Sequence, residues 1–265
     1  MNYREIAPVP ALQPYIKFVW LLDGLDANPN AVPERIFPDG CIELIFNLKK
    51  PLARIDGATL IQQPTSFVFG QITKAMHILA TNTYSVIAVR FTPFGLSAFT
   101  QIPSHEFKGI EVGLENLWGA EGKELEDRVN TLATDDAINA IQHFFLARLK
   151  KQTHSLASIS SIAGLMEAQR GNQTVKHWAD YANLSERQFN RIFNNVIGVS
   201  PKEYLKITRF NKVLNLFDDS NTENLSTLAH RCGYYDQAHF IKDFKEYTGI
   251  TPTGYAADSK TFLPA

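Results

Sequence analysis

Two segments in the C-terminal half of the chain follow one pattern at a constant offset of 51 residues. The repeated positions hold Phe, Phe, Gly, Ser or Thr, Pro and Tyr in the same order. They are Phe189, Phe193, Gly198, Ser200, Pro201 and Tyr204 in the first copy, and Phe240, Phe244, Gly249, Thr251, Pro252 and Tyr255 in the second. Self-similarity at a fixed spacing indicates that one small structural unit is used twice.

The first copy predicts a helix-turn-helix. A short amphipathic helix over 175–182 is followed by a turn at 183–184. Ser185 then stands where an N-cap is expected, and Gln188 completes a capping box for the next helix. The positions predicted to be buried in that helix are Phe189, Ile192, Phe193 and Val196. The opposite face carries Arg187, Asn190, Arg191 and Asn194. Arg and Asn pair with guanine and adenine edges in the DNA major groove, so this face predicts base recognition.

The second copy repeats this arrangement. A first helix is expected over 225–232, Gly233 is expected to make the turn with positive φ, and Asp236 is the expected N-cap. The predicted buried positions are Phe240, Phe244 and Tyr247, and the predicted outward positions are Ala238, Ile241, Lys242 and Lys245. Lysines of this kind contact phosphates more often than bases. The first unit is therefore expected to supply more of the sequence specificity.

A connecting helix is predicted from Ser200 to about Leu216, because Ser, Pro and Glu stand at its N-cap, first and third positions. Its length is roughly 24 Å at the usual rise per residue. A spacer of that size can hold two recognition helices about one DNA turn, near 34 Å, apart. We therefore expect contacts with two adjacent major grooves of double-stranded DNA. The expected DNA-binding residues are Ser185, Glu186, Arg187, Gln188, Asn190, Arg191, Asn194, Arg209, Asp236, Gln237, Ala238, His239, Ile241, Lys242 and Lys245.

Composition limits the remaining possibilities. The formal net charge is −1, so affinity for DNA has to come from a local patch. The two cysteines, Cys41 and Cys232, belong to no Cys/His cluster, and we expect no disulfide framework, metal or cofactor. The sequence shows no charged-then-apolar leader and no apolar run of about 20 residues, which predicts a cytoplasmic protein without membrane contact.

The N-terminal half has a different pattern, so the predicted fold class is α+β with two domains. Residues 1–152 are expected to form a β-rich domain, either cupin-like or a small sandwich or barrel, with helices at its end. Short runs rich in branched and aromatic residues predict strands at 15–22, 41–46, 66–69 and 86–91. Residues 153–265 are expected to form an all-helical domain, with helix-turn-helix units at about 174–196 and 225–247.

The end of the N-terminal half is predicted to be helical from 114 to 151. One helical face carries Ile138, Ile141, Phe144 and Phe145. Core packing explains this face better than an interface does, but it is also the first choice for a dimer helix. The polar stretch 150–155 is the predicted linker.

Residues from about 156 to 257 resemble the DNA-binding domain of the AraC/XylS family of bacterial transcription regulators. The main carrying motifs are Leu184-Ser-Glu-Arg-Gln-Phe189, Gly198-Val-Ser-Pro201, Gly233-Tyr-Tyr-Asp-Gln-Ala-His-Phe240 and Gly249-Ile-Thr-Pro252. The resemblance implies a seven-helix domain that bends or follows DNA, and RNA polymerase as a further partner if the protein is an activator. It places Arg209 near the DNA backbone, although an internal salt bridge explains Arg209 equally well. Lys242 stands where arginine is commoner in the family.

The segments 38–46, 69–71 and 89–96 resemble the N-terminal domain of the same subgroup. In better-known members this half is a cupin-like sensor that binds a small effector and helps to form a homodimer. The candidate effector-binding residues here are Asp39, Glu43, His77 and Arg90. Turn capping for Asp39, and ion pairing for Glu43 and Arg90, are the alternatives.

The leading prediction is thus a sequence-specific DNA-binding transcription regulator that is not an enzyme and responds to an effector through its N-terminal half. In one alternative, that half only dimerises or binds a partner protein. In a remote alternative, the chain is a DNA alkylation-repair enzyme. Such an enzyme needs an activated cysteine, and Cys41 has no neighbouring histidine.

Overall fold

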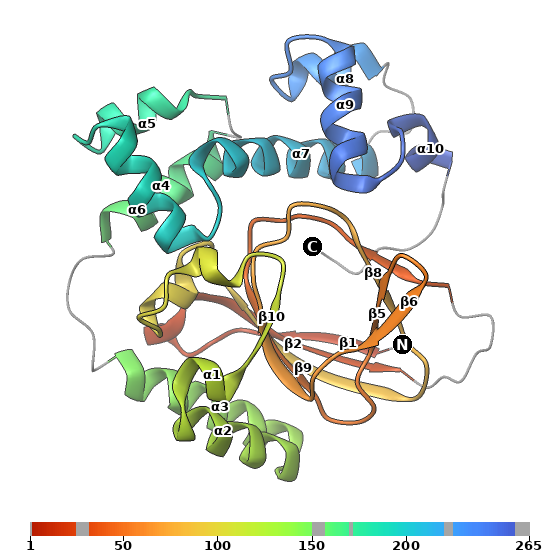
Figure 1. Cartoon of the computed structure of the whole chain (residues 1–265), viewed down its shortest axis with the longest axis vertical. Helices are drawn as coiled ribbons and strands as arrows, with labels where there is room; N and C mark the ends of the chain where they lie inside the picture. The colour runs from red at the N-terminus through yellow and green to blue at the C-terminus, as the bar shows by residue number, and fades with distance from the viewer. Residues whose placement is uncertain (1, 25–31, 150–156, 170–171, 220–224, 258–265) are drawn as a thin grey trace.

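The computed structural model describes residues 2–24, 32–149, 157–169, 172–219 and 225–257. A β-rich N-terminal half is followed by a helical C-terminal half, which confirms the predicted fold class (Figure 1). The predicted linker at 150–155 lies outside the described residues.

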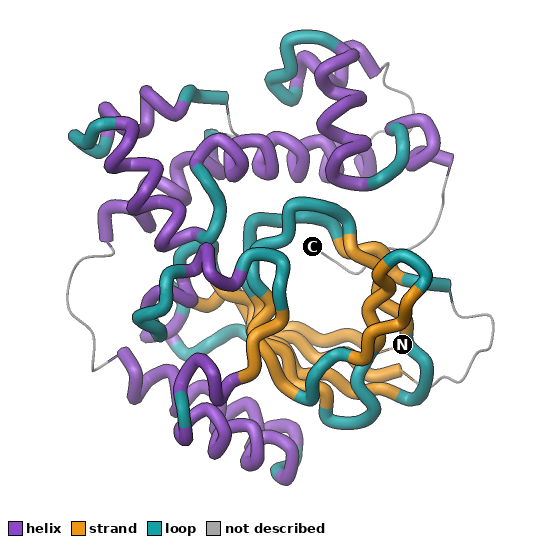
Figure 2. The backbone as a smooth tube through the Cα atoms, viewed as in Figure 1, coloured by secondary structure: helices purple, strands orange, loops and turns teal. Residues whose placement is uncertain are grey.

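The strands of the described residues form two sheets whose pairings are antiparallel. Sheet A has, in spatial order, β1 (Asn2–Ile6), β2 (Ile16–Gly24), β9 (Tyr84–Phe91), β4 (Glu43–Asn47), β7 (Ser66–Phe69) and β10 (Glu111–Gly113). Sheet B has β3 (Glu34–Ile36), β8 (Met76–Leu79), β5 (Ala53–Asp56) and β6 (Thr59–Gln62). Figure 2 shows these strands wrapped around a common interior. The four predicted strands correspond to β2, β4, β7 and β9.

The outer face of sheet A packs on short and long helices that follow the strands. These are η1 (Pro10–Leu12), η2 (Gly95–Ala98), η3 (Ser104–Phe107), α1 (Leu114–Trp118), α2 (Ala120–Thr131) and α3 (Thr134–Leu149). Phe91 on β9 and Phe145 on α3 meet with ring centroids 5.5 Å apart, and Phe99 lies 4.6 Å from Phe145. Burial of such apolar surface is the main favourable contribution to folding. It anchors α3 to the sheet.

The predicted dimer helix is therefore part of this core. Ile138, Ile141 and Phe145 are buried, and Phe144 packs against Trp118 with ring centroids 5.1 Å apart. The interpretation of this face as core is confirmed. The face is not available for a dimer contact, because its side chains already contact sheet A and α1.

The helical half contains, within the described residues, the seven helices that the resemblance implies. They are α4 (Ala157–Ala168), α5 (Val175–Tyr181), α6 (Glu186–Ile197), α7 (Pro201–Asp219), α8 (Leu225–Arg231), α9 (Gln237–Thr248) and α10 (Pro252–Ala257). Two separate apolar cores hold them. One contains Trp178, Phe189 and Phe193, and the other contains Phe240 and Phe244.

Helix α7 joins the two cores, and Figure 1 shows it running from the α5–α6 pair to the α8–α9 pair. Tyr204 and Leu205 belong to the first core, whereas Phe210 and Val213 belong to the second. The helix has 19 residues. At the usual rise its length is roughly 28 Å, slightly longer than predicted.

Candidate nucleic-acid interface

The start of α6 is fixed by the predicted capping box. The Gln188 backbone N donates to Ser185 Oγ at 3.3 Å, and the Ser185 backbone N donates to Gln188 Oε1 at 3.2 Å. Asn183 makes the preceding turn with a φ of 54°, a conformation that asparagine tolerates better than most residues. Two predicted DNA-binding residues, Ser185 and Gln188, are thus engaged in positioning the helix.

The outward face of α6 is only partly as predicted. Arg187 and Arg191 are exposed, and so is Glu186 in the first turn. Asn190 and Asn194 are half-buried. The Asn190 side-chain amide also donates to the Glu186 carbonyl at 2.7 Å. Of the four predicted Arg and Asn side chains of this face, the two arginines are therefore the exposed ones.

The second unit has the same local construction. Asp236 Oδ1 accepts from the His239 backbone N at 2.7 Å, which confirms the predicted N-cap of α9. Gly233 makes the turn with a φ of +80°, as predicted. His239 Nε2 lies 3.5 Å from Asp243 Oδ2 on the same helix. Part of the His239 imidazole is thus directed along α9.

An open hollow lies along the outward face of α9. Its described lining residues are Ala238, Ile241, Lys242, Lys245 and Glu246. Ala238, Lys242 and Lys245 are exposed, as is Gln237 beside them, and Ile241 is half-buried. The surface thus combines apolar side chains, which can contact thymine methyl groups, with two ammonium groups.

Arg209 on α7 is half-buried and lies close to the second unit. Its guanidinium carbon is 5.7 Å from the centroid of the Tyr234 ring, a cation–π distance. This contact is internal to the helical half. The approach of Arg209 to the DNA backbone stays a prediction.

Asp243 and Lys206 help to fix α9, and the sequence reasoning missed both. Asp243 is buried, and its Oδ1 lies 3.4 Å from Lys206 Nζ on α7. The same ammonium lies 3.7 Å from Glu246 Oε2. The position of Asp243 corresponds to Ile192 in the first copy of the repeat. This break in the repeat was the available signal that a polar contact replaces an apolar one.

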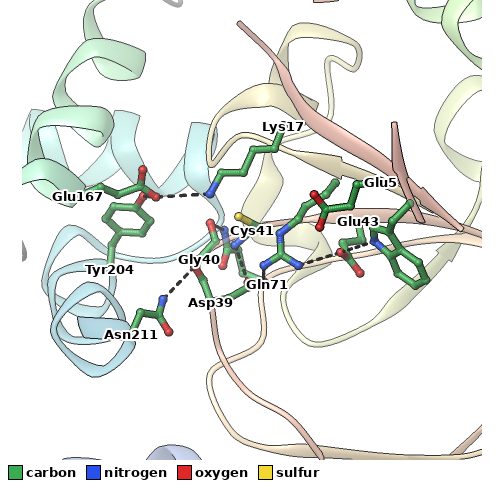
Figure 3. A network of polar contacts seen from close by, with 12 residues as sticks. Glu5, Lys17, Asp39, Gly40, Cys41, Glu43, Gln71, Glu167, Tyr204 and Asn211 are labelled. Atoms are coloured by element: carbon green, nitrogen blue, oxygen red, sulfur yellow. Dashed lines mark hydrogen bonds and ion pairs between the residues drawn. The ribbon is translucent and has the colours of Figure 1, made fainter. Parts of the chain in front are cut away.

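In the N-terminal half, three of the four candidate effector residues lie together, and Figure 3 labels two of them, Asp39 and Glu43. Arg90 Nη1 lies 3.1 Å from Glu43 Oε1, and Arg90 Nη2 pairs with Asp39 Oδ2. The Trp20 indole also donates to Glu43 Oε1, at 3.1 Å. His77 lies on β8 of sheet B and pairs with residues of β3 and β5. The two alternative roles are also present. Glu43 and Arg90 form an ion pair, and Asp39 Oδ1 caps the turn by accepting from the Cys41 backbone N at 2.8 Å.

The charges of this cluster are unequal, because one guanidinium faces two carboxylates. Burial raises the pKa of Glu43 to about 7, and the hydrogen bond from Trp20 opposes this shift. Burial lowers the pKa of Arg90 to about 10. Aromatic side chains lie beside the charges, with the Phe18 ring centroid 5.8 Å from the Arg90 guanidinium carbon. A few convergent polar groups among aromatic rings are typical of small-molecule sites.

Neither cysteine has the surroundings of a catalytic nucleophile. Both are buried, and burial raises the pKa of Cys41 to about 11. Since the thiolate is the reactive form, this raised pKa lowers the reactivity of Cys41 at neutral pH. In the described part of the chain, no three His, Cys, Asp or Glu side chains are grouped so as to hold a metal ion. Across the same residues, no helix combines the length and apolarity that crossing a bilayer requires.

Two family models match the chain. The model described as a helix-turn-helix domain matches residues 178–258, and the one described as a domain of unknown function (DUF6597) matches residues 4–112. The first covers the capped helices α6 and α9 and the connecting helix α7. The C-terminal region is an AraC-type helix-turn-helix domain.

Individual relatives are more distant. The chain is 28% identical over 96 residues to an uncharacterized HTH-type transcriptional regulator of Haemophilus influenzae, which covers 36% of this chain and 32% of the relative. It is 27% identical over 179 residues to the HTH-type transcriptional regulator GbdR of Pseudomonas aeruginosa, with 66% and 45% covered. The chain spans less than half the length of these relatives. A solved structure of ToxT from Vibrio cholerae is 15% identical, with 91% of this chain and 96% of that one covered and a TM-score of 0.45.

Proposed function

We propose that this protein is a sequence-specific DNA-binding regulator of transcription that responds to a small effector through residues 1–152. The observation that carries the proposal is the pair of capped recognition helices, α6 and α9, held at the two ends of α7. Each exposes basic side chains on its outward face. The names of the matched relatives, which are HTH-type transcriptional regulators, support the same function.

The two recognition helices have different proposed roles. Arg187 and Arg191 on α6 read base edges, because guanidinium groups pair bidentately with guanine in the major groove. Lys242 and Lys245 on α9 contact phosphates, and Ala238 lies against thymine methyl groups. Asn190 can read a base only after its amide leaves the Glu186 carbonyl. The first unit is therefore the main source of specificity, as its sequence predicts.

The effector is proposed to bind at Arg90, Glu43 and Asp39. The surplus carboxylate and the raised pKa of Glu43 mean that the cluster can still gain from a polar ligand. The neighbouring Trp20 and Phe18 rings offer apolar surface. RNA polymerase is the further partner if the protein activates transcription.

Selection of DNA fragments by the full chain, followed by sequencing, tests the DNA-binding function. We expect a motif with two conserved blocks about one helical turn apart. The Arg187→Ala/Arg191→Ala double variant should lose the motif. Arg128→Ala, which removes an exposed arginine from α2, is the matched control and should keep it. Equal recovery of all fragments by the full chain would contradict sequence-specific binding.

A thermal-shift screen with metabolites tests the effector function. A ligand at 100 times its dissociation constant adds about 2.7 kcal/mol of stability. The shift should disappear in Glu43→Gln and persist in Glu111→Gln, which changes a different partly buried ion pair of the same half. A shift that survives Glu43→Gln would place the ligand elsewhere.

A further inference from the structure

The loop Phe37–Cys41, called here the joint loop, connects β3 to β4 and lies against α7 of the DNA-binding half (Figure 3). The Asp39 carbonyl accepts from the Asn211 side-chain amide at 3.1 Å. Gly40 has a φ of +81°, and a Cβ there would lie only 3.0 Å from the Tyr204 ring. A larger residue at position 40 would therefore require the Tyr204 ring to shift by a few tenths of an ångström.

The first residue of the joint loop is part of a core in the other half. Phe37 is 8% exposed and belongs to the apolar cluster around α8 and α9. Its ring centroid lies 6.1 Å from that of Phe210 and 6.0 Å from that of Tyr255. The second helix-turn-helix core is therefore completed by a side chain from the N-terminal half.

The first helix-turn-helix unit is also held against the N-terminal half. Ser104 Oγ on η3 donates to the Val196 carbonyl at the end of α6, at 2.9 Å. Lys17 Nζ lies 4.0 Å from Glu167 Oε1 on α4, and that oxygen accepts from the Tyr204 hydroxyl at 2.9 Å. Both units and α7 are thus fixed relative to sheet A.

These contacts leave the outward faces of α6 and α9 uncovered. Arg187, Arg191, Lys242 and Lys245 are all exposed in the docked arrangement. The N-terminal half therefore supports the reading helices without blocking them. A support of this kind fixes the relative positions of the two units in advance, so less conformational entropy is lost when they bind DNA.

Asp39 connects this support to the interior of the N-terminal half. Its carboxylate pairs with the buried Arg90 guanidinium, while its carbonyl holds Asn211. Gln71 adds a second restraint, because its side-chain amide donates to the Gly40 carbonyl at 2.7 Å. Asp39 therefore contacts both the buried Arg90 guanidinium and α7.

We propose that the joint loop couples the Arg90 cluster to the orientation of the two helix-turn-helix units, and that the Asp39–Arg90 pair keeps these units aligned for DNA. This inference rests on the proposed function and adds the route of regulation. When Arg90 leaves Asp39, the joint loop loses one of its anchors, its contact with α7 loosens, and DNA binding weakens.

The test interrupts the route at each end. Asp39→Asn keeps an oxygen for the Cys41 cap but presents an uncharged group to Arg90, and Asn211→Ala removes the amide on α7. The matched controls are Glu111→Gln for the first variant and Asn215→Ala, an exposed residue of α7, for the second. DNA affinity is measured on the fragment selected by the full chain.

We expect each test variant to bind that fragment at least about fivefold more weakly, the lower limit of typical coupling between sites. The controls should stay within about twofold of the unchanged chain. The double variant should be no weaker than the weaker single variant, because both changes interrupt one route. Unchanged or tighter binding by either test variant, or losses that multiply in the double variant, would overturn the proposal.

A second measurement does not depend on DNA. Spin labels at Glu124→Cys on α2 and Thr227→Cys on α8 report the distance between the halves, since both positions are exposed and the two native cysteines are buried. We expect one narrow distance distribution that broadens in both test variants and not in the controls. An unchanged distance distribution in the test variants would contradict the proposed coupling through the joint loop. A full chain that selects no DNA would instead contradict the proposed function and leave this readout valid.

Folding is verified by circular dichroism. If Asp39→Asn does not fold, Gly40→Ala replaces it, because the added methyl group presses on Tyr204. Gly57→Ala is its control, since Gly57 also has a positive φ but has no atom within 4 Å of an added Cβ. The same broadening of the distance distribution and the same loss of DNA affinity are expected for Gly40→Ala and not for Gly57→Ala.

Discussion

Glu43→Gln should change how the stability of this protein depends on pH. Burial raises the pKa of Glu43 from its usual value of 4.5 to about 7, and the hydrogen bond from Trp20 offsets only part of this shift. In the unfolded chain the carboxyl ionises near its usual pKa. Between these two pH values the folded protein therefore holds a proton that the unfolded chain has lost.

The sign of the effect follows from this difference. The favourable contribution of protonated Glu43 is complete below pH 4.5 and is lost as the pH rises to about 7. Each pH unit between the two values corresponds to about 1.4 kcal/mol, so the full loss is about 3 kcal/mol. The glutamine side chain of the variant does not titrate, and its oxygen can still accept from Trp20 and Arg90.

The assay is urea unfolding of both chains from pH 4.5 to 8, compared as the difference in unfolding free energy at each pH. As the pH rises across this window, the unfolding free energy of the variant should increase relative to that of the unchanged protein, by up to about 3 kcal/mol. Glu111→Gln provides the control for loss of a carboxylate from another ion pair. A difference that stays constant with pH, or one in which the unchanged protein gains as the pH rises, would refute the reasoning.

Three further changes have defined outcomes. Arg191→Ala should cost about 1–3 kcal/mol of DNA-binding free energy at one base position and relax discrimination there. Fluorescence anisotropy measures this loss, with Arg128→Ala as the control. Equal losses on all sequences would make Arg191 a phosphate contact. Gly233→Ala should destabilise the fold about as much as Gly57→Ala, because both glycines have positive φ and the atom nearest an added Cβ at 233, Asn172 Oδ1 at 2.4 Å, is the end of an exposed side chain that can turn away. A clearly lower unfolding midpoint for Gly233→Ala would show that the Asn172 side chain is held in place. Cys41 should react with iodoacetamide at pH 7.5 at least about 100-fold more slowly in the folded protein than in urea, since burial raises its pKa to about 11; comparable rates would mean that the loop around Cys41 opens freely.

Local signals predicted the helical half well. The cap at Ser185 and the glycine at 233 act over a few residues, so the sequence alone contains the information that positions the starts of α6 and α9. The capping box at Ser185 and Gln188 and the N-cap at Asp236 are present as predicted. Half of the predicted Arg/Asn face is less exposed than expected, because Asn190 and Asn194 lie nearer the body of the domain.

The β-rich half was predicted only where strands are strongly apolar. The hairpin of β5 and β6 was missed, although its two-residue turn begins with a glycine, Gly57, between two short runs. The meeting of Asp39, Glu43 and Arg90 depends on strand pairing, which places Glu43 opposite Arg90. Pairing of this kind is set by the whole sheet and cannot be inferred from one segment.

The contact between the halves was beyond the reach of the sequence patterns. Asp39 and Asn211 are 172 residues apart, and neither belongs to a periodic stripe. The predicted roles of Asp39 concerned its own turn and a ligand. Its backbone carbonyl, which holds α7, carries no residue-specific signal at all.

The position of Phe37 has a consequence for protein engineering. A fragment that starts at α4 would leave a vacancy beside Phe210 and Tyr255, where the ring of Phe37 is packed. Burying a phenylalanine side chain is worth about 1.5–3 kcal/mol, a large share of the stability of a small domain. Hybrid proteins that join these DNA-binding helices to a different sensor domain should therefore include the segment around Phe37. That segment lies more than a hundred residues upstream of the domain boundary that the sequence alone would suggest.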